Sequence, residues 1–192
     1  MESLSPEIVK KLQTFKGLIL DADGVWFSGH EYRAVLDGKL IALKRRHYHD
    51  GQGLSFLRSL PIKVVFATGE NEPLPSLINK MNDELSCKNG TWAEVEYFTN
   101  ELKKGGKVES LETWLEKHHL NWSECAYIGD DSTDYDAMKM AGLKIAPSNG
   151  TRLIKKIADI ILTRSGGEGC VREFSEIVLD ARNIDETELP FT

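Results

Sequence analysis

The sequence predicts an α/β fold in which helices flank a largely parallel β-sheet. Short β-branched apolar runs alternate along the chain with stretches of helical periodicity, which is typical of parallel strands joined by crossover helices. Three of these runs end in aspartate, threonine or glycine residues, as strands do where an α/β sheet forms its ligand crevice. With 192 residues, 41% of them hydrophobic, the chain is long enough for one domain but too short for a second full one.

The helices and strands can be assigned in chain order. Ser5, Pro6 and Glu7 are typical of a helix start, because proline at the first helical position sacrifices no hydrogen bond. This helix is expected to end near Gly17. Apolar runs predict strands over residues 17–23, 63–69, 125–131, 143–147 and 157–162. Helical patterns predict helices over residues 53–60, about 73–82, 108–119, 132–141 and 171–181.

Between residues 29 and 48 the pattern predicts a projecting β-hairpin. The runs EYRAVL and KLIALKRRHY flank Asp37 and Gly38, and an Asp-Gly pair strongly favours a two-residue hairpin turn. His47 and His49 are then expected on one face of a strand, where they serve as a substrate rim, a subunit contact or plain surface. From residue 84 to residue 106 the pattern supports only one strand, within residues 92–98.

Composition narrows the possible partners. The net charge of −6 disfavours a nucleic-acid partner, and no apolar run approaches the roughly 20 residues of a membrane span. The N-terminus lacks a signal-peptide pattern. We therefore expect a cytoplasmic protein that acts on a small molecule, with no nucleic-acid or membrane partner. Cys87, Cys125 and Cys170 are odd in number and widely spaced, which predicts reduced thiols.

Two acidic clusters follow predicted strands. Asp21 and Asp23 end the first strand, and Asp130, Asp131 and Asp134 lie at the end of the strand over residues 125–131 and just beyond it. Taken singly, the clusters also fit an Asp-Gly turn and a helix cap. If the two strands are neighbours, however, their like charges repel one another in a partly dry cleft. A bound cation relieves that repulsion, and an all-oxygen donor set suits Mg²⁺.

Two further positions offer groups to a phosphate. Thr68 and Gly69 end the second strand with a hydroxyl and an accessible backbone N–H. Lys107 lies at a predicted helix start, where the helix dipole disfavours a cation. Another group is therefore expected to hold Lys107 there, and a solvated surface lysine is the alternative.

The order of these groups resembles the four motifs of the haloacid dehalogenase superfamily of phosphotransferases. The matching segments are D-A-D-G at 21–24, T-G at 68–69, the lysine at 107 and G-D-D-S-T-D at 129–134. The resemblance implies phosphoryl transfer with a Mg²⁺ cofactor and an aspartyl-phosphate intermediate.

The same resemblance implies a role for each motif residue. Asp21 attacks phosphorus, and Asp23 acts as general acid and base. Thr68 and Lys107 bind the phosphoryl oxygens. The implied metal ligands are Asp21, Asp130 and the backbone carbonyl of Asp23. Asp131 and Asp134 support the site, Asp134 by orienting Lys107 or a metal-bound water, and Asp131 equally as a cap.

A closer resemblance extends over nearly the whole chain. H-D-G-Q-G at 49–53 and G-G-E-G-C-V-R-E at 166–173 are similar to the R-D-G-x-G and G-G-x-G-A-x-R-E segments of the 3-deoxy-manno-octulosonate 8-phosphate phosphatases. This resemblance implies a single Rossmann-like domain over residues 1–192 with no cap domain and a C-terminal tail over residues 165–192. It also implies a 3-deoxy-2-ketosugar acid phosphate as substrate and a homotetramer whose hairpin closes a neighbour's active site. The implied substrate-binding residues are Asp23, His49, Asp50, Gly51, Gly69, Glu70 and Lys107.

Three departures from that family affect substrate recognition rather than phosphoryl transfer. Glu70 stands where the family has the arginine of T-G-R, residues 46–49 read R-H-Y-H instead of F-N-V-R, and the chain between Thr68 and Lys107 is longer. The same chemistry on another small phosphorylated sugar or metabolite is therefore an alternative, and a non-catalytic regulatory domain is a second. A phosphoacceptor receiver domain carries its acidic groups in a different order.

Overall fold

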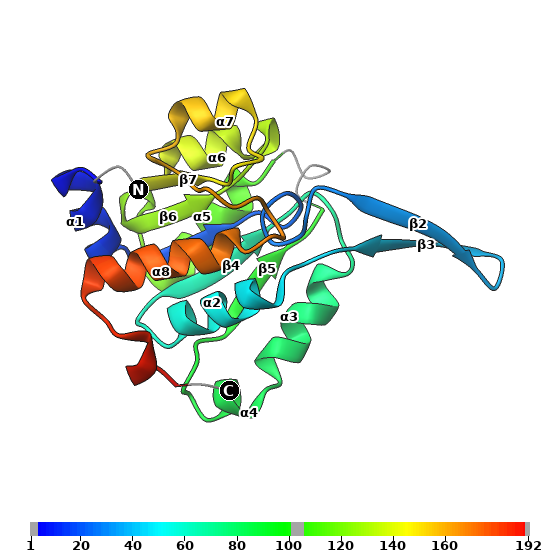
Figure 1. Cartoon of the computed structure of the whole chain (residues 1–192), viewed down its shortest axis with the longest axis horizontal. Coiled ribbons are helices and arrows are strands. Elements are labelled where there is room, and N and C mark those ends of the chain that lie inside the picture. Colours follow the sequence, from blue (N-terminus) through cyan, green and yellow to red (C-terminus); the bar gives the residue numbers. More distant parts are fainter. Residues whose placement is uncertain (1–3, 101–105, 191–192) are drawn as a thin grey trace.

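The computed structural model describes residues 4–100 and 106–190. Parallel strands form one six-stranded sheet in the order β5-β4-β1-β6-β7-β8, and an antiparallel pair forms the separate β2-β3 hairpin (Figure 1). The sheet consists of β1 (Gly17–Leu20), β4 (Lys63–Ala67), β5 (Val95–Phe98), β6 (Cys125–Ile128), β7 (Leu143–Ala146) and β8 (Ile160–Ile161). The predicted α/β class is confirmed.

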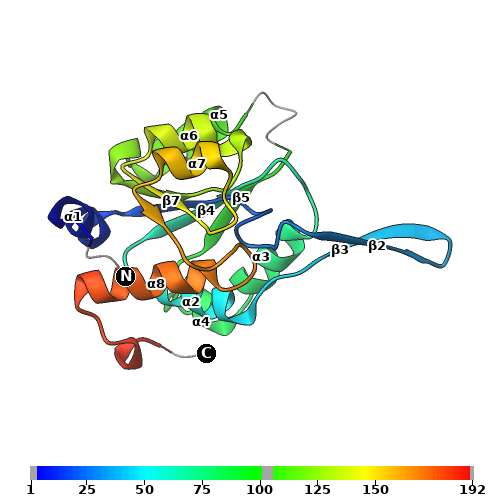
Figure 2. The same cartoon turned by 45° about the horizontal axis from the view of Figure 1, so that its top comes forward.

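Helices cover both faces of the sheet because successive strand residues point to opposite sides. In β1, Leu18 and Leu20 join one apolar cluster, whereas Ile19 joins the other. The first cluster includes residues of α1 (Pro6–Thr14), α2 (Tyr48–Arg58), α3 (Leu74–Asn82) and α8 (Cys170–Arg182). The second includes residues of α5 (Val108–His118), α6 (Tyr135–Met140) and α7 (Arg152–Ile157), which lie together on the opposite side of the sheet (Figure 2). No helix of the described residues has both the length and the apolar composition needed to cross a membrane.

The strand register brings three loops to one level at the carboxyl edge of the sheet. Leu20, the last residue of β1, pairs with Phe66 of β4 and Ile128 of β6. The next strand along the chain in this sheet, β4, lies on one side of β1, and β6 lies on the other. The strand order therefore reverses at β1, and open α/β sheets bind their ligands at such a reversal.

The predicted hairpin is confirmed, and it projects from the body of the protein (Figure 1). Strand β2 (Glu31–Leu36) pairs with β3 (Lys39–Lys44). Asp37 and Gly38 have φ angles of 50° and 73°. Two consecutive positive φ angles define the turn type whose twist matches the strands, and an Asp-Gly pair adopts them readily.

Several element boundaries differ from those expected. The hairpin ends at Lys44, and α2 begins at Tyr48 instead of residue 53. The prediction that His47 and His49 share a strand face is therefore wrong. His47 is the N-cap of α2, and its ring Nδ1 accepts a hydrogen bond from the His49 backbone N–H at 3.2 Å. Helix α7 and the short α4 (Leu85–Lys88) were not predicted, because such short segments show little periodicity.

Asp50 joins α2 to the start of α8. Its carboxylate is fully buried and accepts hydrogen bonds from the backbone N–H groups of Gly169 and Arg172, both at 3.0 Å. The first N–H groups of a helix have no partner within the helix, and a carboxylate also suits the positive end of the helix dipole. Asp50 therefore fixes the position of α8 on the sheet.

We expect Asp50→Ala to lower the free energy of unfolding by about 2–3 kcal/mol, because it leaves one buried and one partly buried N–H group unpaired. Chemical denaturation measures the change. Asp83→Ala is the matched control, since Asp83 is exposed and, among the described residues, forms an ion pair only with Lys88, at 3.2 Å. Its loss should cost about 0.5 kcal/mol or less. Equal destabilisation by the two substitutions would contradict the capping role of Asp50.

Candidate active site

A buried lysine lies between two buried carboxylates at the carboxyl edge of the sheet. The Nζ of Lys107 is 2.6 Å from Asp21 Oδ1 and 2.6 Å from Asp134 Oδ1, and all three side chains are at most 8% exposed. Lys107 is the N-cap of α5, so these carboxylates offset the unfavourable helix dipole that the sequence indicated. The alternative of a solvated surface lysine is excluded.

These charges influence each other's protonation. Burial favours the neutral amine, but Asp21 and Asp134 outweigh it and raise the pKa of Lys107. Burial raises the pKa of Asp21, an effect that Lys107 opposes and Asp134 reinforces. Lys107 therefore remains an ammonium and neutralises part of the negative charge.

Asp134 is held on both of its oxygens. Besides Lys107, Oδ1 accepts a hydrogen bond from the Tyr127 hydroxyl at 2.9 Å, and Oδ2 accepts from the backbone N–H groups of Asp130 and Asp131 at 3.0 and 3.3 Å. Asp134 therefore contacts Lys107 from a fixed position, and its expected function of orienting Lys107 stays a prediction. Tyr127 was not predicted from the sequence, because nothing in an apolar strand shows which group a hydroxyl will bond.

Asp130 provides an unsatisfied oxygen for a cation. Its Oδ1 is buried and has no hydrogen-bond partner among the described residues. Single oxygens of Asp21, Asp130 and Asp134 lie within 4.8 Å of one another. Burial, followed by repulsion from the neighbouring aspartates, raises the pKa of Asp130 to about 8. Because donors already surround Asp134, the carboxylates of Asp21 and Asp130 fit a hard cation such as Mg²⁺ best.

Asp23 opens into a cavity of about 220 Å³ beside this cluster. Its Oδ2 accepts a hydrogen bond from Lys44 Nζ at 2.7 Å, and the Lys44 side chain is only 10% exposed. Lys44 comes from the base of the hairpin and was not predicted as a site residue from the sequence. The cavity is lined by Asp23, Ser28, Gly29, His30, Glu31, Lys44 and Glu70.

Thr68 follows β4 at the same edge of the sheet. The residue is buried, and its hydroxyl oxygen accepts a hydrogen bond from the Glu70 backbone N–H at 3.2 Å. Its own hydroxyl hydrogen is then available to a ligand. Gly69 is half-buried beside it, as an accessible backbone N–H requires.

Other predicted residues lie apart from this cluster or serve the fold. Asp50 is fully buried beneath α8, so the expected substrate contact of its side chain is corrected to a capping role. His49 is exposed in the first turn of α2, and Gly51 is half-buried in the same helix. Asp131 caps the short helix over Ser132–Asp134 through the Ser132 backbone N–H at 2.7 Å.

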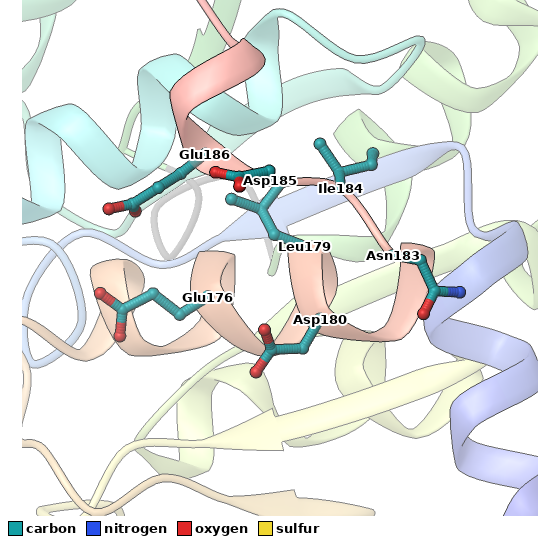
Figure 3. Close-up of a pocket in the computed structure, with 7 residues that line it drawn as sticks. All are labelled: Glu176, Leu179, Asp180, Asn183, Ile184, Asp185 and Glu186. Atoms are coloured by element: carbon teal, nitrogen blue, oxygen red, sulfur yellow. The ribbon is translucent and has the colours of Figure 1, made fainter.

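A larger cavity, of about 480 Å³, lies at the carboxyl end of α8 (Figure 3). It is lined by Glu176, Leu179, Asp180, Asn183, Ile184, Asp185 and Glu186. Arg182 anchors this end of α8 to the carbonyls of Leu12 and Phe15, just before β1 begins. The cavity is therefore at the amino edge of the sheet, opposite Lys107, and has no part in the candidate site.

Sequence comparison identifies the class of protein. Residues 57–174 match the family of haloacid dehalogenase-like hydrolases, and the chain belongs to this family. It is 28% identical over 173 residues to the 3-deoxy-D-manno-octulosonate 8-phosphate phosphatase KdsC of Haemophilus influenzae. The aligned region covers 90% of this chain and 87% of the relative. The resemblance seen in the motifs is confirmed, and the family and this relative support a phosphatase.

Two further relatives extend the comparison. A structure of 3-deoxy-D-manno-octulosonate 8-phosphate phosphatase from Moraxella catarrhalis, in complex with magnesium ion, phosphate ion and a KDO molecule, has a TM-score of 0.75 and 28% identity, with 92% of each chain covered. N-acylneuraminate cytidylyltransferase B of Danio rerio is 28% identical over 83% of this chain, which spans only 34% of that protein.

The pKa of Asp130 predicts an unusual pH dependence of stability without metal. Between its ordinary value of 3.8 and its folded value of about 8, the folded state retains a proton that the unfolded state has lost, so the free energy of unfolding falls as pH rises. From pH 6 to pH 8 in chelator, we expect Asp130 alone to cause a loss of about 2 kcal/mol.

Saturating Mg²⁺ should abolish that loss, because it stabilises the ionised carboxylate. Chemical denaturation at both pH values, with Mg²⁺ or with chelator, measures the difference. Asp130→Asn is the control and should show a smaller effect of Mg²⁺. Identical pH dependence of the natural chain under the two conditions would disprove the expectation.

Proposed function

We propose that this protein is a Mg²⁺-dependent phosphomonoester hydrolase that acts through an aspartyl-phosphate intermediate. The observation that carries the proposal is the buried contact of Lys107 with Asp21, beside the unpartnered Oδ1 of Asp130. This arrangement supports the proposal because it brings a carboxylate, an ammonium and an unpartnered carboxylate oxygen close together. The family match supports the same chemistry.

In this mechanism, an Asp21 oxygen attacks phosphorus in line with the ester bond, which breaks as the new bond forms. Asp23 gives its proton to the leaving oxygen and then takes a proton from the water that hydrolyses the intermediate. Lys107 and the Thr68 hydroxyl stabilise the charge on the phosphoryl oxygens. When bound by Asp21, Asp130 and the Asp23 backbone carbonyl, Mg²⁺ would supply further charge neutralisation at the phosphoryl group.

We propose a 3-deoxy-2-ketosugar acid phosphate, such as 3-deoxy-manno-octulosonate 8-phosphate, as the substrate. The similarity to phosphatases of that name supports it. Another small phosphorylated sugar is the second candidate. It is favoured by Glu70, which lines the cavity beside Asp23 where the resembling family has an arginine.

We also propose that the active form is a homotetramer that assembles through the β2-β3 hairpin. Exposed apolar side chains cover much of this hairpin, and large exposed apolar patches mark interaction surfaces. The apolar residues are Tyr32, Val35, Leu36, Leu40 and Leu43, exposed by 53–71%. The base of the hairpin carries Lys44 to Asp23, so a partner that fixes the hairpin also defines the cavity.

We expect Asp21→Asn to lower kcat on a phosphomonoester by at least about 1,000-fold, because the nucleophile and a metal ligand are lost together. Excess chelator should abolish turnover by the natural chain, and added Mg²⁺ should restore it. Steady-state release of inorganic phosphate measures both effects. Full turnover by Asp21→Asn, or by the natural chain in chelator, would refute the proposed chemistry.

The hairpin should be required for assembly. We expect the double substitution Val35→Lys, Leu40→Lys to give monomers in light scattering coupled to size-exclusion chromatography, because charges on these surfaces oppose apolar burial. Turnover should fall by about 10-fold or more as bulk water enters the site. Leu153→Lys, on an exposed position of α7, is the control and should leave assembly unchanged. A fully active monomeric natural chain would contradict the proposal.

Glu70 should slow hydrolysis of the sugar acid phosphate. Compared with an arginine, a carboxylate at position 70 cannot donate a charge-assisted hydrogen bond to the carboxylate of the sugar acid, and it repels that group. Glu70→Arg should therefore raise kcat/KM for 3-deoxy-manno-octulosonate 8-phosphate by roughly 30-fold. Glu72→Arg, two residues along the chain and outside the cavity lining, should change it less than about 3-fold. Efficient natural turnover with no gain from Glu70→Arg would show that Glu70 does not oppose this substrate.

A further inference from the structure

Asn149 connects three loops beside Asp130. It lies in the loop after β7, where its Nδ2 donates a hydrogen bond to the Gly24 carbonyl at 2.9 Å. The same Nδ2 lies 3.4 Å from Asp130 Oδ2. Its Oδ1 accepts a hydrogen bond from the Gly166 backbone N–H at 2.6 Å. One side chain thus joins the loop after β1 and the C-terminal segment at the carboxylate of Asp130.

The packing around this carboxylate leaves little freedom where it faces Gly24. Gly24 has a φ of +90°, and a Cβ atom there would lie 2.0 Å from Asp130 Oδ2 and 2.6 Å from Oδ1. A Cβ atom at Gly166 would lie 1.8 Å from the Gly24 carbonyl oxygen. Because the three loops are in close contact, we expect a substitution of Asn149, which joins them, to change their positions relative to the Asp130 carboxylate.

The two oxygens of Asp130 therefore have different surroundings. Oδ2 lies 3.4 Å from the Asn149 amide nitrogen, whereas Oδ1 is buried and has no hydrogen-bond partner among the described residues. A carboxylate held through one oxygen presents the other in a defined direction. Groups that orient a metal ligand in this way affect metal affinity without touching the ion.

We propose that Asn149 is a positioning residue that orients the Asp130 carboxylate so that Oδ1 faces the divalent cation. This inference rests on the proposed function, because it takes Asp130 as a metal ligand. Asn149 also holds the Gly166 loop beside the site, so a single side chain links the C-terminal segment to the metal-binding carboxylate.

The test is Mg²⁺ binding by the free protein, measured by titration calorimetry and by the rise in melting temperature that Mg²⁺ produces. Asn149→Ala should raise the dissociation constant by about 10-fold, while kcat at saturating Mg²⁺ changes less. Asn149→Gln retains the amide but displaces it by one methylene, so it should also weaken Mg²⁺ binding. It replaces Asn149→Ala in this test if the alanine variant does not fold.

Ser148→Ala is the matched control. The Ser148 and Ser165 hydroxyls hydrogen-bond at 2.7 Å and join the same two loops, but the structure gives Ser148 no hydrogen bond to Asp130. This variant should bind Mg²⁺ within about 2-fold of the natural chain. An equal loss of affinity in Ser148→Ala would show that Asn149 acts only by joining loops, and that result would overturn the proposal.

The remaining outcomes separate this inference from the proposed function. Natural affinity in Asn149→Ala, together with weakened binding in Asp130→Asn, overturns the role of Asn149 and leaves the metal site intact. No Mg²⁺ binding by the natural chain, or unchanged binding by Asp130→Asn, overturns the proposed metal site and this inference with it.

Discussion

The buried ammonium of Lys107 between Asp21 and Asp134 is the interaction on which the arrangement of this site depends. Removing one charge from water is costly, and removing three is tolerable only when their geometry pairs them closely. The contact therefore requires the loop after β1, the loop after β6 and the first turn of α5 to meet at one point. Any change in strand register would separate them.

The same point of the fold holds more negative charge than Lys107 neutralises. Asp130 lies beside the pair with an oxygen that nothing in the described chain satisfies, and its raised pKa records the repulsion as well as the burial. Repulsion between neighbouring carboxylates is common in sites that bind a cation. The backbone donors that hold Asp134 keep the cluster from relaxing outward.

The groups that we propose for phosphoryl transfer and those that we propose for substrate recognition occupy different parts of the molecule. Asp21, Thr68 and Lys107 are buried at the ends of core elements, so their positions follow from the packing of the sheet. Lys44 and Glu70 come from a projecting hairpin and an exposed loop. Exposed segments tolerate substitution more readily than core positions do, so the proposed recognition groups can vary without disturbing the buried cluster.

The sequence by itself determined the features that local physics controls. Alternation of apolar runs placed the strands and their polar ends, and Asp37-Gly38 specified the hairpin turn through its positive φ angles. The conflict between Lys107 and the helix dipole showed that a partner was needed. Each of these depends on residues close together in the chain.

Only the tertiary structure decided which residues meet. Lys107 and Asp21 are 86 residues apart, and their contact follows from the packing of α5 against β1, which local patterns do not encode. For the same reason Tyr127, Asn149 and the buried capping role of Asp50 were invisible in the sequence. Hydrogen-bonding capacity is a property of a residue, but its partner is set by packing across the whole fold.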